Sequence, residues 1–526
     1  MKKFIAIFVI LAMCSISFAQ LQVVNQKQIT INKGDEISVM ELGQKGFVVF
    51  TKTNNEDSKK LKDWSFTLYN PDIEVVWEKK LTLDKFQELL TMDSYNGDIN
   101  IVYYDGIISQ VEIITLVKIS AEGEISKKEI NLKNKIGVEG AHFINGNCYL
   151  ISYFLKYKQS ALARTCLNCL IVPIVMGITM PTVISEVQKA DFSSLTLTSN
   201  KIQMPEYGAV TNHTSDGKNI YLRVKSSKKK FPYDAIYNIE DGVVMEKTPI
   251  KKVDNTEIEY MNVIIPDSAH KFVLGLSKKE VLGARKKDDK TFYQYYITNL
   301  EKDDIQTINK VDKDISNELF KDRNVSIKNK FFGTNYLVRG SGDIMSSCFR
   351  FNGKNFVVFD KYQKIYSEHT NCNGKTCYTY YVFESYYYTN TIVWCFNDEG
   401  DVEWSKNFEY DIVSPYYHAK TCARPYKDNT IALIGHFDNE LSYKTLSMEG
   451  DVIEGTEKQK VSNKSKFSDL TQFNNSITHL YENTYLVWGN DDDNKSGDDN
   501  EKSKARKKED KKKKTLNLIF KIIEFK

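Results

Sequence analysis

Residues 391–408 read TIVWCFNDEGDVEWSKNF, and this stretch contains a complete strand–turn–strand pattern. The oxygen-rich residues around Gly400 suit either a cation-binding loop or a tight turn between strands. A similar segment, Glu449-Gly450-Asp451-Val452, follows 50 residues after Glu399-Gly400-Asp401-Val402, and Glu122-Gly123-Glu124-Ile125 is a third copy. A glycine that adopts positive φ at a repeated turn explains this recurrence better than a metal loop. We therefore interpret NDEGD as a turn in a repeated β-unit.

Short runs typical of β-strands recur along the whole chain. Their second residues are separated by 52, 50, 71, 52, 84, 75 and 54 positions, so four of the seven steps lie near 50. The three long steps coincide with insertions. The runs are residues 46–50, 98–104, 148–154, 219–224, 271–276, 355–359, 430–435 and 484–489.

Each run is followed by a second strand-like run, a polar turn in most cases, and a further strand. The second runs include residues 64–70, 192–198 and 391–397. In several units a strand also precedes the first run, as in residues 89–104 with their Asn-Gly hairpin signal. Four strands in about 50 residues, repeated about eight times, predict an all-β fold in the form of a single closed β-propeller.

The last unit has no room for its outermost strand, and residues 21–32 look strand-like. We therefore expect the N-terminal strand to complete the last blade. Seven blades instead of eight, or two packed β-sandwich domains, are the alternatives.

The first 19 residues have the pattern of a secretory signal peptide. Two lysines precede an apolar run, and Ser17-Phe18-Ala19 is a small-x-small cleavage pattern. Lipidation at Cys14 is an alternative, although the residue before such a cysteine is normally small and here is Met13. We expect an exported chain, cleaved after Ala19, that is periplasmic, outer-membrane associated or extracellular.

The composition excludes a strong general attraction for nucleic acid. The 72 basic and 69 acidic residues leave a net charge of only +3. Eight cysteines remain after cleavage, and an even number in an exported chain predicts disulfides. Cys372 and Cys377, in CNGKTC with a glycine at the bend, are the best local pair, whereas the remaining connectivity is open.

The stretch 391–408, with weaker copies at SFTLYNPDIEVVWEKKL and YKTLSMEGDVIEGTE, resembles the repeat of quinoprotein-type (PQQ-like) β-propellers. In that family a strand, an Asp/Asn–Gly turn and a Trp-bearing strand recur in each blade. Trp stands at the expected place in Trp77 and Trp404. No residues match those that hold the quinone cofactor, so the resemblance implies the architecture and no cofactor.

Four insertions interrupt the predicted propeller at residues 20–526, and one of them, at about 305–345, is charged and mixed, as expected of a short helix and loop. Residues 155–190 are apolar, and we expect them to form a buried plug or a docking patch. They also contain Cys166-x-x-Cys169, and the alternatives for these two cysteines are a redox pair or half of a zinc site. Residues 361–390 are rich in cysteine and tyrosine. Residues 490–514 are a charged loop that we expect to be disordered; its acidic half resembles a calcium loop, but Ser503 replaces the final glutamate.

Two of the seven histidines deserve comparison because they stand at equivalent positions. His142 precedes Cys148 by six residues, and His213 precedes Asn219 by six. Both are therefore predicted on the strand that lines the central channel. A pair of histidines there could hold a metal, but no carboxylate partner accompanies them, and we assign no metal, catalytic or cofactor-binding residue.

The sequence favours a non-catalytic binding scaffold at the cell envelope, with a protein or glycan as partner and no nucleic acid. The alternative is a propeller enzyme, either a hydrolase or a quinone-type oxidoreductase, with its site at the channel mouth. Residues 166–184 could be a membrane anchor, although two prolines argue against a spanning helix in the mature chain. The residues proposed for recognition are Tyr378, Tyr380, Tyr381, Tyr386, Tyr387 and Tyr388.

Overall fold

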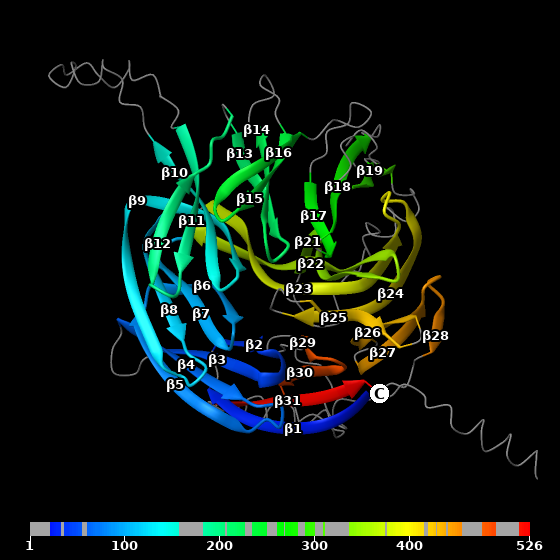
Figure 1. Ribbon diagram of the computed structural model, residues 1–526, viewed down its shortest axis with the longest axis horizontal. Helices are drawn as coiled ribbons and strands as arrows, with labels where there is room; N and C mark the ends of the chain where they lie inside the picture. The colour runs from blue at the N-terminus through cyan, green and yellow to red at the C-terminus, as the bar shows by residue number, and fades with distance from the viewer. Residues whose placement is uncertain are drawn as a thin grey trace, which may run out of the picture. The chain divides into compact units, whose positions relative to one another are not determined.

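The computed structural model is built from antiparallel β-sheets (Figure 1). Residues 1–20, with the predicted signal peptide, lie outside its described part. The described residues are 21–32, 36–54, 60–156, 182–205, 208–226, 234–249, 260–267, 269–281, 290–299, 309–310, 336–373, 376–414, 419–427, 429–437, 440–454, 476–490 and 515–525.

These residues belong to two compact units. Unit 1 contains Met1–Phe50, Thr67–Val76 and Asp312–Lys526, and unit 2 contains Thr51–Phe66 and Trp77–Val311. The first four-stranded sheet along the chain has the order β2 (Glu36–Glu41), β3 (Phe47–Asn54), β4 (Leu61–Tyr69) and β5 (Val75–Asp84), with the short 3-10 helix η1 (Gly43–Lys45) after β2.

Unit 2 contains a seven-stranded sheet and two four-stranded sheets. The strand β9 is 20 residues long: its first half pairs with β8 and its second half with β10, so the large sheet is two four-stranded groups that share one strand. The strands of the large sheet are β6 (Gln87–Tyr95), β7 (Asp98–Asp105), β8 (Val111–Ile119), β9 (Ile125–Ile144), β10 (Asn147–Lys156), β11 (Thr182–Asp191) and β12 (Thr196–Lys201). The others are β13 (Gly208–Ser215), β14 (Ile220–Ser226), β15 (Asp234–Glu240) and β16 (Val243–Pro249), and then β17 (Tyr260–Asp267), β18 (His270–Val281), β19 (Lys290–Asn299) and β20 (Asn309–Lys310).

Unit 1 contains three further four-stranded sheets. In the last of them the N-terminal strand β1 pairs with β31 along its whole length, from Leu21 opposite Phe525 to Asn32 opposite Thr515. The strands of the three sheets are β21 (Tyr336–Phe351), β22 (Lys354–Asn373), β23 (Thr376–Phe396) and β24 (Val402–Ser414); β25 (Thr421–Tyr426), β26 (Thr430–Phe437), β27 (Glu440–Ser447) and β28 (Val452–Glu454); and β1 (Leu21–Asn32), β31 (Thr515–Phe525), β30 (Thr484–Asn490) and β29 (Ser476–Tyr481).

The all-β prediction is confirmed, whereas the predicted closed propeller is not shown: the sheets of the described residues are separate and open, and none of them closes into a barrel. The eight apolar runs found in the sequence coincide with the second strand of each four-stranded group, from β3 to β30. Asn96 and Gly97 both have positive φ in the predicted Asn-Gly hairpin between β6 and β7.

One predicted strand, residues 192–198, is only partly confirmed, because residues 196–198 begin β12 but the residues before them are not strand. Residues 192–195 form a turn, in which Asp191 accepts hydrogen bonds from the N–H groups of Ser193 at 2.7 Å and Ser194 at 3.4 Å. Another strand lies earlier, in β11, inside the stretch expected as the first insertion. Buried polar residues of β11, Glu186 and Gln188, interrupt the apolar run and conceal this strand in the sequence.

Apolar side chains of successive four-stranded groups pack between their sheets. In unit 2 one cluster joins Tyr149 and Ile151 of β10 to Leu222 and Tyr237 of the next sheet. In unit 1 equivalent clusters lie between β21–β24 and β25–β28, and between β25–β28 and the sheet of β29–β31. The groups joined by these clusters therefore bury one face against a neighbour in the same unit, which individual sheets need for stability.

Two tryptophans tie an outer strand to the turn of the following group. Trp404 Nε1, on β24, donates to the carbonyl oxygen of Met448 at 2.9 Å. Gly450, with φ of +83°, lies against the Trp404 ring, and a Cβ there would be 2.6 Å from it. Trp77 donates in the same way to the carbonyl oxygen of Ala121 at 3.0 Å. The recurring glycine and tryptophan of the sequence thus belong to one structural contact between groups.

Candidate functional site: a histidine pair

The NDEGD stretch that raised the question of a cation loop is a turn. Gly400 has φ of +92°, its N–H donates to the Asn397 carbonyl oxygen at 3.1 Å, and the Asn397 side chain accepts from the N–H groups of Glu399 and Asp401. The Asp398 carboxylate is held by the Arg350 guanidinium and by Asn355. Its oxygens therefore stabilise the turn and are not arranged for a cation.

His142 and His213, which the sequence placed at equivalent positions, lie in direct contact. His142 is on β9, opposite Tyr149, and His213 is on β13, opposite Leu222. Nε2 of His142 and Nδ1 of His213 are 2.8 Å apart, and the rings meet edge to face with centroids 5.0 Å apart. Both side chains are half-buried. The strands β9 and β13 of unit 2 thus bring two imidazoles together.

Gly140 makes the approach of His213 to β9 possible. A Cβ at residue 140 would lie 2.1 Å from Cε1 and 2.2 Å from Nε2 of His213, closer than any real contact. The His213 ring therefore lies directly on the β9 backbone, and its Nε2 is 3.1 Å from the carbonyl oxygen of Glu139. A glycine two residues before His142 is the sequence signal for this packing.

The tautomers of the pair follow from this contact. A carbonyl oxygen only accepts, so Nε2 of His213 carries the proton, and in a neutral ring Nδ1 is then the acceptor. His142 Nε2–H donates to it across the 2.8 Å contact. Burial, with a smaller contribution from His213, lowers the pKa of His142 to about 4, so this ring is neutral near pH 7.

The described residues contain no group of three or more His, Cys, Asp or Glu side chains that could hold a metal ion. His479, on β29 in unit 1, donates from Nε2 to the Glu482 carbonyl oxygen at 2.8 Å and packs edge-on against Tyr485. Burial lowers its pKa. It contacts no second imidazole among the described residues, so the pair in unit 2 is the stronger candidate.

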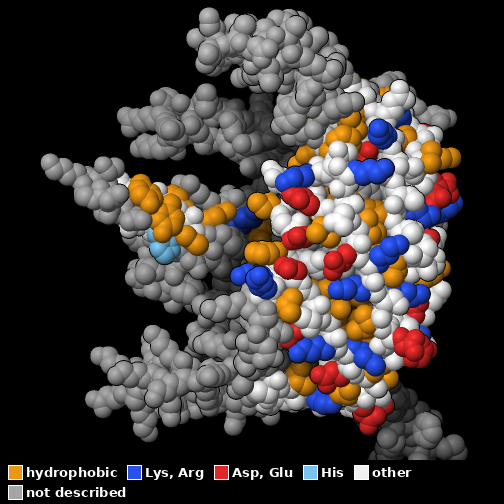
Figure 2. Space-filling model, turned by 90° about the vertical axis from the view of Figure 1, so that its left-hand side faces the viewer, with side chains coloured by type: hydrophobic (Ala, Val, Ile, Leu, Met, Phe, Trp, Pro, Cys, Tyr) orange, Lys and Arg blue, Asp and Glu red, His pale blue; other side chains and the backbone are white. Residues whose placement is uncertain are grey.

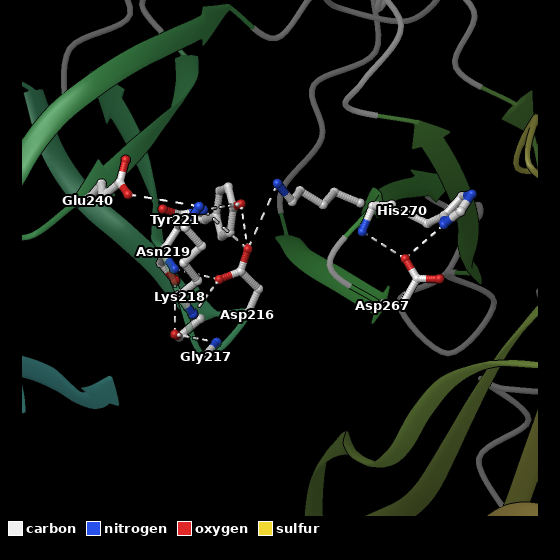
Figure 3. Close-up of polar contacts among 11 residues, drawn as sticks. Asp216, Gly217, Lys218, Asn219, Tyr221, Glu240, Asp267 and His270 are labelled. Atoms are coloured by element: carbon white, nitrogen blue, oxygen red, sulfur yellow. Dashed lines mark hydrogen bonds and ion pairs between the residues drawn. The ribbon is translucent and has the colours of Figure 1, made fainter. Parts of the chain in front are cut away.

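A second polar group occupies two hairpin turns of unit 2 (Figure 3). Burial opposes ionisation of Asp216, but hydrogen bonds from the N–H groups of Asn219 and Lys218 and from the Tyr221 hydroxyl hold its pKa below the ordinary value. Lys271 of the next sheet approaches it at 3.9 Å. The Asp216 carboxylate therefore closes its own hairpin and ties it to the following one.

A third polar group is buried in unit 1. Asp360 on β22 accepts hydrogen bonds from the Thr391 and Thr421 hydroxyls at 2.6 and 2.8 Å, and from the N–H groups of Lys420 and Thr421. Lys420 is fully buried, 4.9 Å from the centre of the Tyr388 ring, and burial lowers its pKa to about 8. These contacts hold the start of β25 against β22.

The six tyrosines proposed for recognition divide into two sets. Tyr378, Tyr380 and Tyr381 are exposed, near the tip of the β22–β23 hairpin. Tyr387 and Tyr388 are buried in the core, and Tyr386 is half-buried against Tyr362. The last three are therefore packing residues, since they lie where β24 covers β23.

The cysteines and charged segments are placed only in part. Cys377 is disulfide-bonded, and Cys372 is its direct neighbour in the strand register. Cys148, Cys348, Cys395 and Cys422 form no disulfide in the described part of the chain. Cys14, Cys166, Cys169 and the charged loop at 490–514 lie outside the described residues. Within the described part, no helix has the length and apolarity needed to span a membrane.

No protein family matches the chain, and no curated protein matches it in sequence. Solved structures that are similar include an ACO/RPE65 chimera, at 11% identity and a TM-score of 0.31. They also include a mutant and a cobalt-substituted form of Synechocystis apocarotenoid oxygenase (ACO), each at 10% identity and a TM-score of 0.30. Each alignment covers 53% of this chain, and the chain spans 63% of the length of those structures. At such TM-scores the similarity assigns no reaction to this chain.

These comparisons correct two predictions. The similar structures are named as apocarotenoid oxygenases and not as quinoprotein-type propellers, so the predicted resemblance is wrong, and the quinone-type alternative has no support. The prediction of a non-catalytic binding scaffold is wrong on the same finding. The physical reason is local: the glycine turn and the tryptophan are explained by the contact of Trp404 with Gly450, which carries no information about family or function.

Proposed function

We propose that the chain is a metal-dependent enzyme and that His142 and His213 hold a divalent transition-metal ion. The observation that carries the proposal is the 2.8 Å distance between Nε2 of His142 and Nδ1 of His213. Two nitrogen ligands at bond lengths of about 2.0–2.1 Å on a tetrahedral ion stand about 3.3 Å apart. The rings therefore need to separate by only about 0.5 Å to accept an ion between them.

The protonation of the pair suits this role. Imidazole binds a metal only when the ligating nitrogen is deprotonated. His213 already turns the lone pair of Nδ1 toward the site, because its Nε2–H is used by the Glu139 carbonyl oxygen. Such a second hydrogen bond orients a metal-bound histidine. In His142 the proton has to move from Nε2 to Nδ1, and the low pKa of this residue keeps the ring neutral meanwhile.

The number of ligands favours catalysis over a structural role. Structural sites commonly use four protein ligands, whereas catalytic sites keep positions open for water or substrate. Two imidazoles leave at least two such positions. An ion bound in this way would polarise a substrate oxygen or lower the pKa of a bound water molecule.

Titration of the metal-free protein with Co²⁺, Zn²⁺ and Cu²⁺ tests the proposal. We expect one ion per chain, a histidine signature in the Co²⁺ and Cu²⁺ spectra, and loss of binding in His142→Gln and His213→Gln. His270→Gln is the matched control, because this half-buried histidine bonds to Asp267 instead. The proposal is overturned if the wild-type chain binds no stoichiometric ion, or if the His142 and His213 variants bind the ion as tightly as the wild-type chain does. The pair would then be a structural hydrogen bond.

We also propose that the four-stranded groups are eight blades of one propeller, as the sequence predicts. The pairing of β1 with β31 and the Trp–turn contacts within each unit support this. Deletion of residues 21–32 should then lower the stability of the whole chain in one transition. If the rest of the molecule unfolds unchanged, a closed ring is excluded.

We propose that the mature chain acts outside the cytoplasm, as residues 1–19 predict. The disulfide at Cys377 supports this, because such bonds persist in oxidising compartments. Fractionation and N-terminal sequencing should find the exported chain starting at Gln20. A cytoplasmic chain that retains residues 1–19 would contradict this location.

A further inference from the structure

The tip of the β22–β23 hairpin extends beyond the strands that flank it. β21 pairs with β22 only as far as Ser367, and β24 pairs with β23 only from Tyr386. Residues 368–373 and 376–385, here called the ribbon, therefore pair only with one another among the described strands. The ribbon therefore extends from its sheet as a two-stranded hairpin.

One face of the ribbon carries a row of apolar side chains. Successive residues of a strand alternate between faces, so Tyr378, Tyr380 and Val382 share one face, and they are 54%, 44% and 39% exposed. His369, directly opposite Tyr380, is on the same face and stacks on its ring, with centroids 5.5 Å apart at 20°. We name these four residues the tyrosine strip.

The two tyrosine rings of the strip are neighbours. Their centroids are 6.1 Å apart, with an interplanar angle of 34°. Figure 2 shows hydrophobic side chains gathered around a histidine on a projection from the molecule. Large apolar groups that stay exposed on a projection are typical of a binding surface.

The chemistry of the strip defines the ligand. Its side chains are two phenol rings, one isopropyl group and one imidazole, with no Lys, Arg, Asp or Glu among them. Polyanions and anionic membranes are bound through clusters of Lys and Arg, so the strip does not complement them. Flat rings whose edges carry hydroxyl groups complement a ligand with apolar C–H faces and polar edges. Neutral sugar rings have this character.

We propose that the tyrosine strip binds a neutral polysaccharide. Tyr378 and Tyr380 each stack under one sugar unit, and their hydroxyl groups bond to sugar hydroxyls. The 6.1 Å separation of the rings places two sugar units of one chain along the strip. This site is separate from the histidine pair in unit 2, so the inference does not rest on the proposed metal-dependent activity.

The opposite face of the ribbon supplies a matched control. Tyr381 is 42% exposed, close to the 44% of Tyr380, but it points to the other face, as do Thr370 and Thr379, whose hydroxyls are 3.3 Å apart. Removing Tyr381 takes away the same chemical group without touching the strip.

Native affinity electrophoresis in gels that contain laminarin, xyloglucan, mannan or dextran tests the proposal. We expect at least one of these neutral polysaccharides to retard the wild-type chain, and Tyr378→Ala/Tyr380→Ala to weaken binding at least tenfold. Tyr381→Ala should bind like wild type. Unchanged thermal midpoints and unchanged Co²⁺ binding in both variants show that the fold and the histidine pair are intact.

Three results would overturn the inference. The first is no retardation by any of the four neutral polysaccharides. The second is equal loss of binding in Tyr381→Ala, which would remove the distinction between the faces. The third is retention by heparin or by phosphatidylglycerol vesicles without binding to the neutral polymers.

Discussion

Gly450→Ala is expected to destabilise the protein by about 2–4 kcal/mol more than Gly353→Ala. Both glycines lie in unit 1 with φ near +80°, at +83° and +79°, so an alanine pays the same backbone cost of about 1–2 kcal/mol at each. At residue 353 the added Cβ meets no atom within 4 Å. The difference between the two variants therefore measures the contact with Trp404, through its packing and its hydrogen bond.

At residue 450 the added Cβ would lie 2.6 Å from Cδ2 of Trp404, so the indole has to move. Overpacking of this kind costs about 1–3 kcal/mol. Moving the ring also breaks the 2.9 Å hydrogen bond from Nε1 to the Met448 carbonyl oxygen, which contributes about 1 kcal/mol.

Urea unfolding followed by far-UV circular dichroism measures the difference, provided that the slopes of the two variants agree. A Trp404→Ala background gives the control, because Gly450→Ala should cost no more than Gly353→Ala once the indole is absent. The role of this contact is refuted if the two glycine variants destabilise the wild-type chain equally. It is also refuted if Gly450→Ala still destabilises the Trp404→Ala chain more than Gly353→Ala does.

Three other predictions concern titration and the disulfide. The pKa of Lys420 is about 8 in the folded state and near 10.5 when unfolded, so stability should rise by about 3 kcal/mol from pH 8 to 10.5, and this rise should disappear in Lys420→Met. The pKa of His142 is about 4 in the folded state and near 6.5 when unfolded, so the free energy of unfolding should fall by about 3 kcal/mol as the pH decreases from 6.5 to 4. His142→Gln should lack this contribution, and a flat profile in the wild-type chain would contradict a neutral His142 in the folded state. Peptide mapping without reduction should link Cys377 to Cys372, and any other partner would refute the local disulfide.

Much of the strand pattern could be predicted because it depends on neighbouring residues. The apolar run of β7 and the Asn96-Gly97 turn before it are local signals, and the structure contains both. β11 was missed because its polar residues Glu186 and Gln188 are buried. Burial of those side chains depends on the partner sheets, which no local pattern reveals.

The candidate site was predicted in position but not in geometry. Equal spacing put His142 and His213 on equivalent strands, yet their 2.8 Å contact depends on two strands 71 residues apart. Gly140 allows that contact, and its place two residues before His142 is a local signal, but it does not identify His213 as the partner. The tyrosines show the same limit, since Tyr388 and Tyr380 look alike in the sequence, but one is buried and the other exposed.

The sequence alone determined that this chain is all-β, where the second strand of each group lies, and that Gly400 belongs to a turn, because alternation and turn chemistry act over a few residues. Only the tertiary structure decided that Asp398 forms an ion pair with Arg350, that His142 contacts His213, and which tyrosines face solvent. These contacts arise when sheets distant in the chain pack together, and packing depends on the shapes and burial of side chains from several strands at once.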